Sequence, residues 1–316
     1  MLTYALKRAS YFVLLLFGVS VIVFLAMRLV PGDPVVHLAG PFATEKQRDQ
    51  IRQSYGLDKP LVVQYGKWAL RAVRGDLGRS MQLHVPVVEL LSTKLFNTLL
   101  LVAGSMVLAI AAGWSLGIAA GLHPNGWLDR ASLVFALAGI SLPAFWFGMV
   151  LVIVFAINLG LFPASGIFSQ RGDGGGVIDV LWHLTLPAVA TALLPAGMLV
   201  RMCRTAVIEV TRMPFVNALH ARGLSQRLIA RHVIRNAMPT ILNVTGMQAG
   251  FLLTAAIFSE VVFNWPGLGL QIYTAVTAQD YTVVQGAVLF VCILFLLFNI
   301  VVDVLRPLFD PRIALQ

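Results

Sequence analysis

Uncharged, mostly apolar segments recur along this chain and determine how it can be organised. Each reaches about the 20 residues that an apolar helix needs to cross a bilayer. The segments are 9–27, 95–122, 131–170, 180–200, 236–259 and 281–302. Backbone groups inside lipid must pair within their own segment, so each segment is expected to be helical, and the alternating pattern of a membrane barrel is not seen. The pattern predicts an all-α protein that crosses a membrane several times.

The direction of these crossings follows from the basic residues between them. Lys7 and Arg8 place the N-terminus inside the cell, and the stretch 201–235, with seven arginines and one acidic residue, should also lie inside. The segment 131–170 is long enough for two tight spans, but splitting it would put that arginine-rich stretch outside. We therefore expect it to cross once, with a kink or helix break at Pro143. The result is six spans with both termini in the cytoplasm.

The same segments divide the chain into parts with different surroundings. They are a first transmembrane helix with a cytoplasmic N-terminus (1–30), an extracytoplasmic amphipathic segment (31–94), a transmembrane domain (95–306) that contains a structured cytoplasmic loop at 201–235, and a cytoplasmic tail (307–316). In the second part, Thr44 and Gln47 have the spacing of a capping box, and Gly56 can end that helix. Pro60 can open another helix that reaches about Arg74. We expect two short helices on or just outside the membrane; an ordered loop without a role of its own is the alternative.

Composition agrees with a protein whose solvent is mostly lipid, because 58% of the residues are hydrophobic and 12% are charged. The formal net charge of +9 is compatible with nucleic-acid binding. However, the arginines lie beside apolar spans, where membrane orientation explains them, and we expect no nucleic-acid partner. A basic surface without a specific partner is the remaining alternative. The two cysteines, Cys203 and Cys292, predict neither a disulfide framework nor a metal site.

Several residues resemble chemical motifs without their usual context. Gly113-Trp114-Ser115-Leu116-Gly117 has the spacing of a hydrolase nucleophile elbow but lies inside an apolar segment. Gly113, Gly117 and Gly121 recur every four residues, which favours a small-residue face for close helix packing. A hydrolase centred on Ser115 is kept as an alternative. His183 is expected to be a satisfied or interfacial histidine rather than part of a transport path.

Polar side chains within the spans can join helices or line a path, and the pattern does not choose between these roles. They are Asn97, Asn158, Asn243, Gln248 and Asn299. Glu260 lies at the end of its span, just before a loop without Lys or Arg, and is the better candidate for an outer gate. No residue of the substrate path is assigned.

The run from Phe215 to Ser225 predicts a short helix, a break at Gly223 and a second helix. Phe215, Ala218 and Leu219 share one face at helical spacing, a form that can dock in the groove of a soluble partner. The small residues Ala221 and Gly223 permit close approach. Arginines on both sides can pair with acidic groups or lipid phosphates. The chain has no phosphate-binding loop motif, so we expect any nucleotide to be bound by another subunit.

A series of short motifs in order covers nearly the whole chain. The motifs are Pro31-Gly32-Asp33-Pro34, Gly56-Leu57-Asp58-Lys59-Pro60, Gly75-Asp76-Leu77-Gly78, Ser141-Leu142-Pro143-Ala144-Phe145-Trp146, Leu161-Phe162-Pro163-Ala164-Ser165-Gly166, Phe263-Asn264-Trp265-Pro266-Gly267-Leu268-Gly269, Asp280-Tyr281 with Val283-Val284-Gln285-Gly286, and Asp310-Pro311-Arg312. Each is weak alone, but together they resemble the permease subunits of bacterial ABC importers for dipeptides, oligopeptides and nickel. The resemblance implies the type I ABC importer permease fold and a multi-pass protein of the bacterial inner membrane.

The resemblance also implies which residues couple the permease to its motor. The family's coupling motif reads Glu-Ala-Ala, three residues, then Gly, whereas this chain has Asn217-Ala218-Leu219 before Gly223. Ala221-Arg222-Gly223 fits the peptide branch of the family. The implied ATPase-coupling residues are Phe215, Asn217, Ala218, Leu219, Ala221, Arg222, Gly223 and Leu224. The implied outer-gate residues are Glu260, Trp265, Pro266 and Gly267.

As a member of such a family, the chain is expected to be a non-catalytic subunit without a cofactor of its own. Its implied partners are a second, related permease, two ATPase subunits that bind ATP, and an extracytoplasmic solute-binding protein. The expected cargo is a di- or oligopeptide, with nickel, glutathione or another small solute as alternatives. An ion-coupled secondary transporter is a further alternative, but it would need charges within the spans that are nearly absent.

Overall fold

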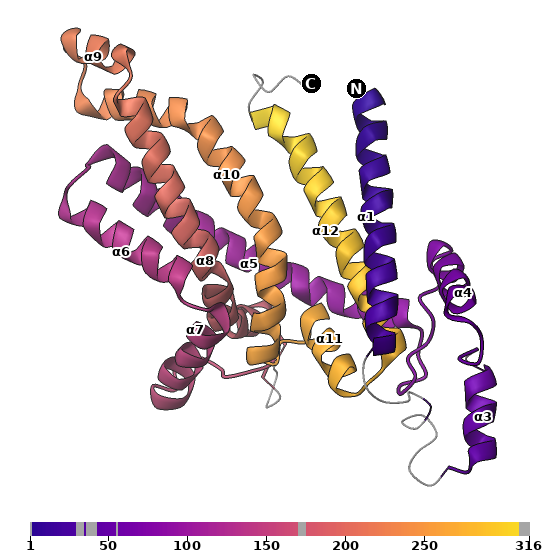
Figure 1. The fold of residues 1–316 in the computed structure, drawn as a ribbon. Coiled ribbons are helices and arrows are strands. Elements are labelled where there is room, and N and C mark those ends of the chain that lie inside the picture. The colour runs from indigo at the N-terminus through magenta and orange to yellow at the C-terminus, as the bar shows by residue number, and fades with distance from the viewer. Residues whose placement is uncertain (1, 30–34, 36–42, 55, 170–174, 310–316) are drawn as a thin grey trace. The chain divides into compact units, whose positions relative to one another are not determined.

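The computed structural model describes residues 2–29, 35, 43–54, 56–169 and 175–309, and every named element among them is a helix (Figure 1). A single backbone bridge, between Arg79 and Pro86, is the nearest approach to a strand pair in these ranges. The chain forms two compact units, Met1–Phe96 with Gly267–Leu297, and Asn97–Pro266 with Phe298–Gln316. Each unit is described by itself.

The first unit contains α1 (Leu2–Leu29), α3 (Glu45–Ser54), α4 (Leu61–Val73), α11 (Leu268–Thr277), the start of α5 (Val87–Leu122) and most of α12 (Tyr281–Phe309). An aromatic cluster joins α1 to α4. The ring of Tyr65 lies 5.4 Å from that of Phe24 and 6.0 Å from that of Trp68, measured between centroids. The hydroxyls of Ser20 and Tyr65 lie 2.8 Å apart. Burial of these rings fixes α4 against the end of α1.

The two short helices predicted after the first span are present, and the signals that predicted them act as expected. The Gln47 side chain accepts the backbone N–H of Thr44 at 2.9 Å, and the hydroxyl of Thr44 accepts the N–H of Gln47 at 3.4 Å. Gly56, with φ +66°, follows α3, and Pro60 precedes α4. The expected motif 31–34 and most of the expected tail 307–316 lie outside the described residues.

The second unit is built around α8 (Val177–Thr211). It also contains most of α5, α6 (Trp127–Ser141), α7 (Ala144–Leu151), the π-helical η1 (Val152–Asn158), α9 (Pro214–Ala221) and α10 (Gln226–Val262). Helix α8 contacts α6, α7 and α10.

The predicted glycine face on α5 is confirmed. A Cβ on Gly117 would lie 2.7 Å from the Cβ of Cys203, and one on Gly121 would lie 2.6 Å from the Cβ of Val207. A Cβ on Gly113 would collide with Leu199, also on α8. Both helices thus meet at four-residue intervals, which lets their backbones approach closely.

Five helices in the described part of the chain are long and apolar enough to cross a membrane, and a sixth span results if α6 and the helix formed by α7 and η1 together (Ala144–Asn158) count as one. These two helices are bent by 107° relative to each other. Leu142 is extended before Pro143, as expected, because the proline ring disfavours the helical conformation of the preceding residue. The predicted helix break at Pro143 is therefore confirmed.

Helices α8 and α10 extend well beyond the apolar segments that predicted them. Arg201 and Arg204 lie on α8, and Arg227, Arg231 and Arg235 lie on α10. The interpretation of 201–235 as one structured loop is therefore wrong in its bounds, because arginine is a good helix former and the helices continue past the uncharged windows. The true connection is 212–225.

Candidate functional site

The connection between α8 and α10 is a tight elbow built around α9. Met213 is extended, and Pro214 then opens the helix at its first position, where a missing N–H costs nothing. The N–H of Leu224 reaches back to the carbonyl of Leu219 at 3.3 Å, and that of Gly223 bonds the carbonyl of His220 at 2.9 Å. Gly223 has φ +76°, a left-handed conformation that side chains disfavour. The predicted helix–glycine–helix form is confirmed.

One face of α9 packs on the protein's own core. Val216 is 2% exposed and lies in a cluster with Val210, Ile229 and Val233. Phe215, Leu219 and Leu224 are half-buried against the same cluster. The expected docking face of Phe215, Ala218 and Leu219 is therefore split: two of its residues anchor the elbow, and Ala218 alone is exposed.

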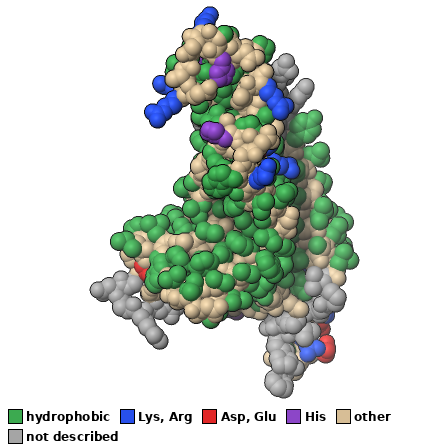
Figure 2. Space-filling view, turned by 90° about the vertical axis from the view of Figure 1, so that its left-hand side faces the viewer, with side chains coloured by type: hydrophobic (Ala, Val, Ile, Leu, Met, Phe, Trp, Pro, Cys, Tyr) green, Lys and Arg blue, Asp and Glu red, His purple; other side chains and the backbone are tan. Residues whose placement is uncertain are grey.

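The opposite face of α9 is exposed and basic. Its accessible residues are Asn217, Ala218, His220, Ala221 and Arg222. Figure 2 shows Arg and His side chains gathered around this elbow. The nearby exposed arginines are Arg212, Arg227, Arg231 and Arg235. No ion pair engages them in the described part of the chain, so the surface is available to an acidic partner.

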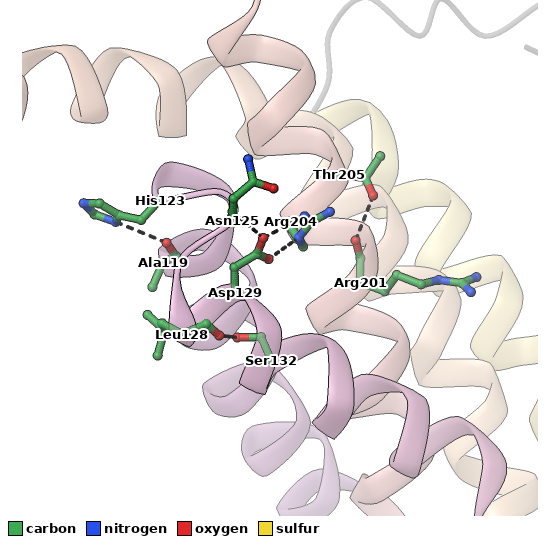
Figure 3. A network of polar contacts seen from close by, with 9 residues as sticks. All are labelled: Ala119, His123, Asn125, Leu128, Asp129, Ser132, Arg201, Arg204 and Thr205. Atoms are coloured by element: carbon green, nitrogen blue, oxygen red, sulfur yellow. Dashed lines mark hydrogen bonds and ion pairs between the residues drawn. The ribbon is translucent and has the colours of Figure 1, made fainter.

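A buried ion pair holds α8 to α6 near this elbow (Figure 3). The Nε and Nη2 atoms of Arg204 donate to the two carboxylate oxygens of Asp129, and the Nη2–Oδ2 distance is 2.9 Å. The backbone N–H of Asn125 donates to the same Oδ2 at 2.8 Å. Asp129 is 2% exposed. This pair was missed from the sequence, where the only signal was an isolated acid beside an apolar segment.

Three of the four expected outer-gate residues lie in a second buried cluster. The hydroxyl of Thr98 donates to Oε1 of the fully buried Glu260 at 2.6 Å, and the Trp265 N–H donates to the Glu260 carbonyl at 2.8 Å. The indole of Trp265 donates to the Asn97 carbonyl at 2.9 Å, and the Asn97 amide donates to the Pro266 carbonyl at 2.9 Å.

These contacts join α5 to the end of α10 and the loop after it. Of the expected gate residues, Glu260, Trp265 and Pro266 are thus brought together. Gly267 belongs to the first unit, where it is buried and precedes α11. A gate here would have to break several buried hydrogen bonds in order to open.

Two other sequence expectations can be placed. His183 is 5% exposed, and its Nδ1 lies 2.9 Å from the carbonyl of Asp179, so it is a satisfied histidine as expected. Ser115 lies within the continuous helix α5, and its hydroxyl donates to the Ala111 carbonyl. The strand–turn–helix that a nucleophile elbow requires is therefore not formed at Ser115.

Comparison with known proteins places these features in context. Residues 94–315 match the family described as "Binding-protein-dependent transport system inner membrane component", and residues 1–101 match the corresponding N-terminal family. The chain is 38% identical over 314 residues to the glutathione transport system permease protein GsiC of Escherichia coli K12, covering 99% of each chain. It is 37% identical over the same length to GsiC of Salmonella paratyphi A.

The fold also resembles a solved structure. Two crystal forms of the MetNI methionine ABC transporter in inward-facing conformations match with TM-scores of 0.52 and 0.55 at 17% identity. Each match covers 70% of this chain and 96% of the other. At this identity the likeness concerns the fold, which is that of a type I ABC importer permease.

Proposed function

Because this chain belongs to the family of binding-protein-dependent transport system inner membrane components, we propose that it is the permease subunit through which an ABC importer takes up small peptides, glutathione among them. It is a multi-pass protein of the inner membrane, and its family is a membrane component that works with other subunits. The cargo and the coupling residues are the proposed part.

The cargo is proposed from the relatives, which match over 99% of the chain and are named as glutathione permeases. Glutathione is itself a small peptide, so this cargo agrees with the di- or oligopeptide expected from the motifs and with the glutathione alternative. A permease served by a separate binding protein needs only a path that is wide and polar enough, because selection can occur before the substrate arrives.

The exposed face of α9 carries the coupling proposal. An ATPase partner would bind Asn217, Ala218, Ala221 and Arg222, which project from an elbow whose other face is anchored to α8 and α10. Movement of this rigid elbow would pass directly into both long helices. ATP would drive the change only if the ATPase pair binds one conformation of the permease more tightly than the other.

The remaining partners follow the same scheme. A second, related permease would complete the path, and a solute-binding protein would dock on the extracytoplasmic side over 31–94. The Asp129–Arg204 pair, which ties α8 to α6, would make α6 follow the elbow.

Transport by the reconstituted complex tests this function. The permease, its partner permease and the ATPase subunits would be placed in liposomes with the binding protein and labelled glutathione. We expect ATP-dependent accumulation that unlabelled di- and tripeptides reduce by competition. Uptake driven by an ion gradient without the ATPase would instead establish the secondary transporter. ATP-dependent uptake of nickel with no response to peptides would overturn the cargo.

A further inference from the structure

The first unit contains a large cavity at the point where two membrane spans end. Its volume is about 1070 Å³, and it lies among the end of α1, the helix α4, the loops on either side of α4 and the start of α12. Both α1 and α12 are apolar enough to cross a membrane. The cavity therefore lies at the height of the membrane surface, where lipid headgroups are found.

Two buried aromatic side chains form part of the wall of this cavity. Trp68 is 7% exposed and Tyr281 is 8% exposed, and both line the cavity. The indole N–H of Trp68, the hydroxyl of Tyr281 and the Nε of Arg28 lack a hydrogen-bond partner in the described part of the chain. These three atoms have almost no accessible surface, so a ligand in the cavity reaches them only if the side chains around them shift.

The rim of the same cavity is strongly basic. The lining contains Arg28, Lys59, Lys67, Arg71 and Arg79 but only one acid, Asp76. Its carboxylate accepts the backbone N–H of Gly78 at 2.8 Å. Close approach of the positively charged Lys59 lowers the pKa of Lys67, and the nearby Asp58 carboxylate opposes this shift. Like charges held this close would be relieved by an anion.

The arrangement around the cavity is held in place by one amide. Gln64 accepts a hydrogen bond from the Arg28 guanidinium and donates to the carbonyl of Lys59 at 2.6 Å. It thereby ties α1, α4 and the loop before α4 together on one side of the cavity. The donors are consequently positioned before any ligand arrives, which reduces the entropy that binding would cost.

We propose that this cavity binds a phosphate-bearing anion, either the headgroup of an anionic phospholipid or soluble phosphate. Phosphate oxygens accept several hydrogen bonds at once and suit a combination of guanidinium and ammonium donors. The volume exceeds that of one phosphate and leaves room for a headgroup. The exposed apolar side chains of α1, such as Leu25 and Leu29, would accompany the acyl chains.

Titration of the full-length chain in detergent micelles tests the proposal and identifies the source of the phosphate. Native mass spectrometry would follow binding of phosphatidylglycerol, with phosphatidylcholine as the zwitterionic comparison. We expect clear preference for phosphatidylglycerol. Displacement of the lipid by millimolar inorganic phosphate would identify soluble phosphate as the occupant, whereas resistance to it would identify the headgroup. Equal binding of the two lipids with no affinity for phosphate would overturn the proposal.

Two sets of variants localise the binding. The pair Lys67→Gln and Arg71→Gln should weaken phosphatidylglycerol binding about tenfold or more, since each basic residue near a headgroup contributes appreciably. The pair Lys46→Gln and Arg74→Gln removes the same charges outside the cavity and should leave binding nearly unchanged. An equal loss in both pairs would show a general charge effect and contradict the site.

Discussion

Asp129 on α6 and Arg204 on α8 form a bidentate ion pair about two helical turns before α8 ends at the elbow. The carboxylate is almost completely buried, whereas the guanidinium is partly exposed, with a side-chain exposure of 21%. The pair therefore connects the proposed motor-binding surface to a helix that does not itself reach the elbow. Because the pair is largely removed from water, the loss of either charge should lower the stability of the protein.

Substitution of either residue of this pair should destabilise the protein, and the two effects should not be additive. Asp129→Asn and Arg204→Leu should each lower the free energy of unfolding by about 2 kcal/mol, since each leaves a partner without its countercharge. The double variant should cost less than the sum of the two. Arg201→Leu, on the same helix but without an ion pair in the described residues, is the matched control. Thermal unfolding in detergent would measure all four, and full additivity would contradict the coupling.

Gly223 should be required for its backbone conformation rather than for its size. Its φ of +76° disfavours side chains, yet nothing lies within 4 Å of a Cβ placed there. Gly223→Val should therefore strain the elbow by about 1–2 kcal/mol and weaken co-purification with the ATPase subunits. Gly223→Asn should be tolerated, because asparagine adopts this conformation more readily. Equal damage by asparagine would instead indicate that the partner approaches this residue closely.

The two faces of α9 should respond differently to substitution. Ala218→Glu and Arg222→Glu alter the exposed face, so they should reduce co-purification of the ATPase without changing the amount or melting temperature of the permease. Phe215→Asp should reduce both, because it places a charge against the hydrophobic cluster beneath the elbow. Arg130→Glu, exposed on α6, is the control. Unchanged co-purification in both exposed-face variants would remove this face from the coupling site.

The glycine face of α5 should tolerate no added side chain. Gly117→Val would place a Cβ 2.7 Å from the Val200 carbonyl on α8, and we expect it to lower stability by about 1–3 kcal/mol. Ser115→Ala, two residues away on an exposed position, should leave both stability and transport unchanged. Thermal unfolding and substrate uptake would measure both variants. Loss of transport with Ser115→Ala alone would revive a chemical role for that hydroxyl.

The elbow should face the cytoplasm. A cysteine introduced by Asn217→Cys lies on the exposed face of α9 and should react with an impermeant maleimide only after the cells are permeabilised. Thr44→Cys, exposed at the start of α3, should react in intact cells. Cys203 is buried, and a background strain carrying Cys292→Ser limits labelling elsewhere. Labelling at position 217 in intact cells would invalidate both the orientation and the proposed contact with the ATPase.

Much of the local structure could be predicted from the sequence, because each of these features depends on residues that are close together in the chain. The capping pair of Thr44 and Gln47, the break at Pro143, the glycine turn at 223 and the four-residue glycine repeat each depend on backbone geometry or helical spacing. Uncharged length likewise located the spans, because lipid tolerates no unpaired backbone.

Tertiary structure alone decided which faces meet and which remain free. By helical spacing, Phe215, Ala218 and Leu219 share one face, so side-chain type could not show that Phe215 and Leu219 anchor the elbow while Ala218 is exposed. The cluster that separates them comes from α8 and α10. Nor could side-chain type pair Asp129 with Arg204, 75 residues apart, or bring Arg28, Trp68 and Tyr281 around one cavity. Such relations depend on how distant helices pack, and local periodicity carries no information about that packing.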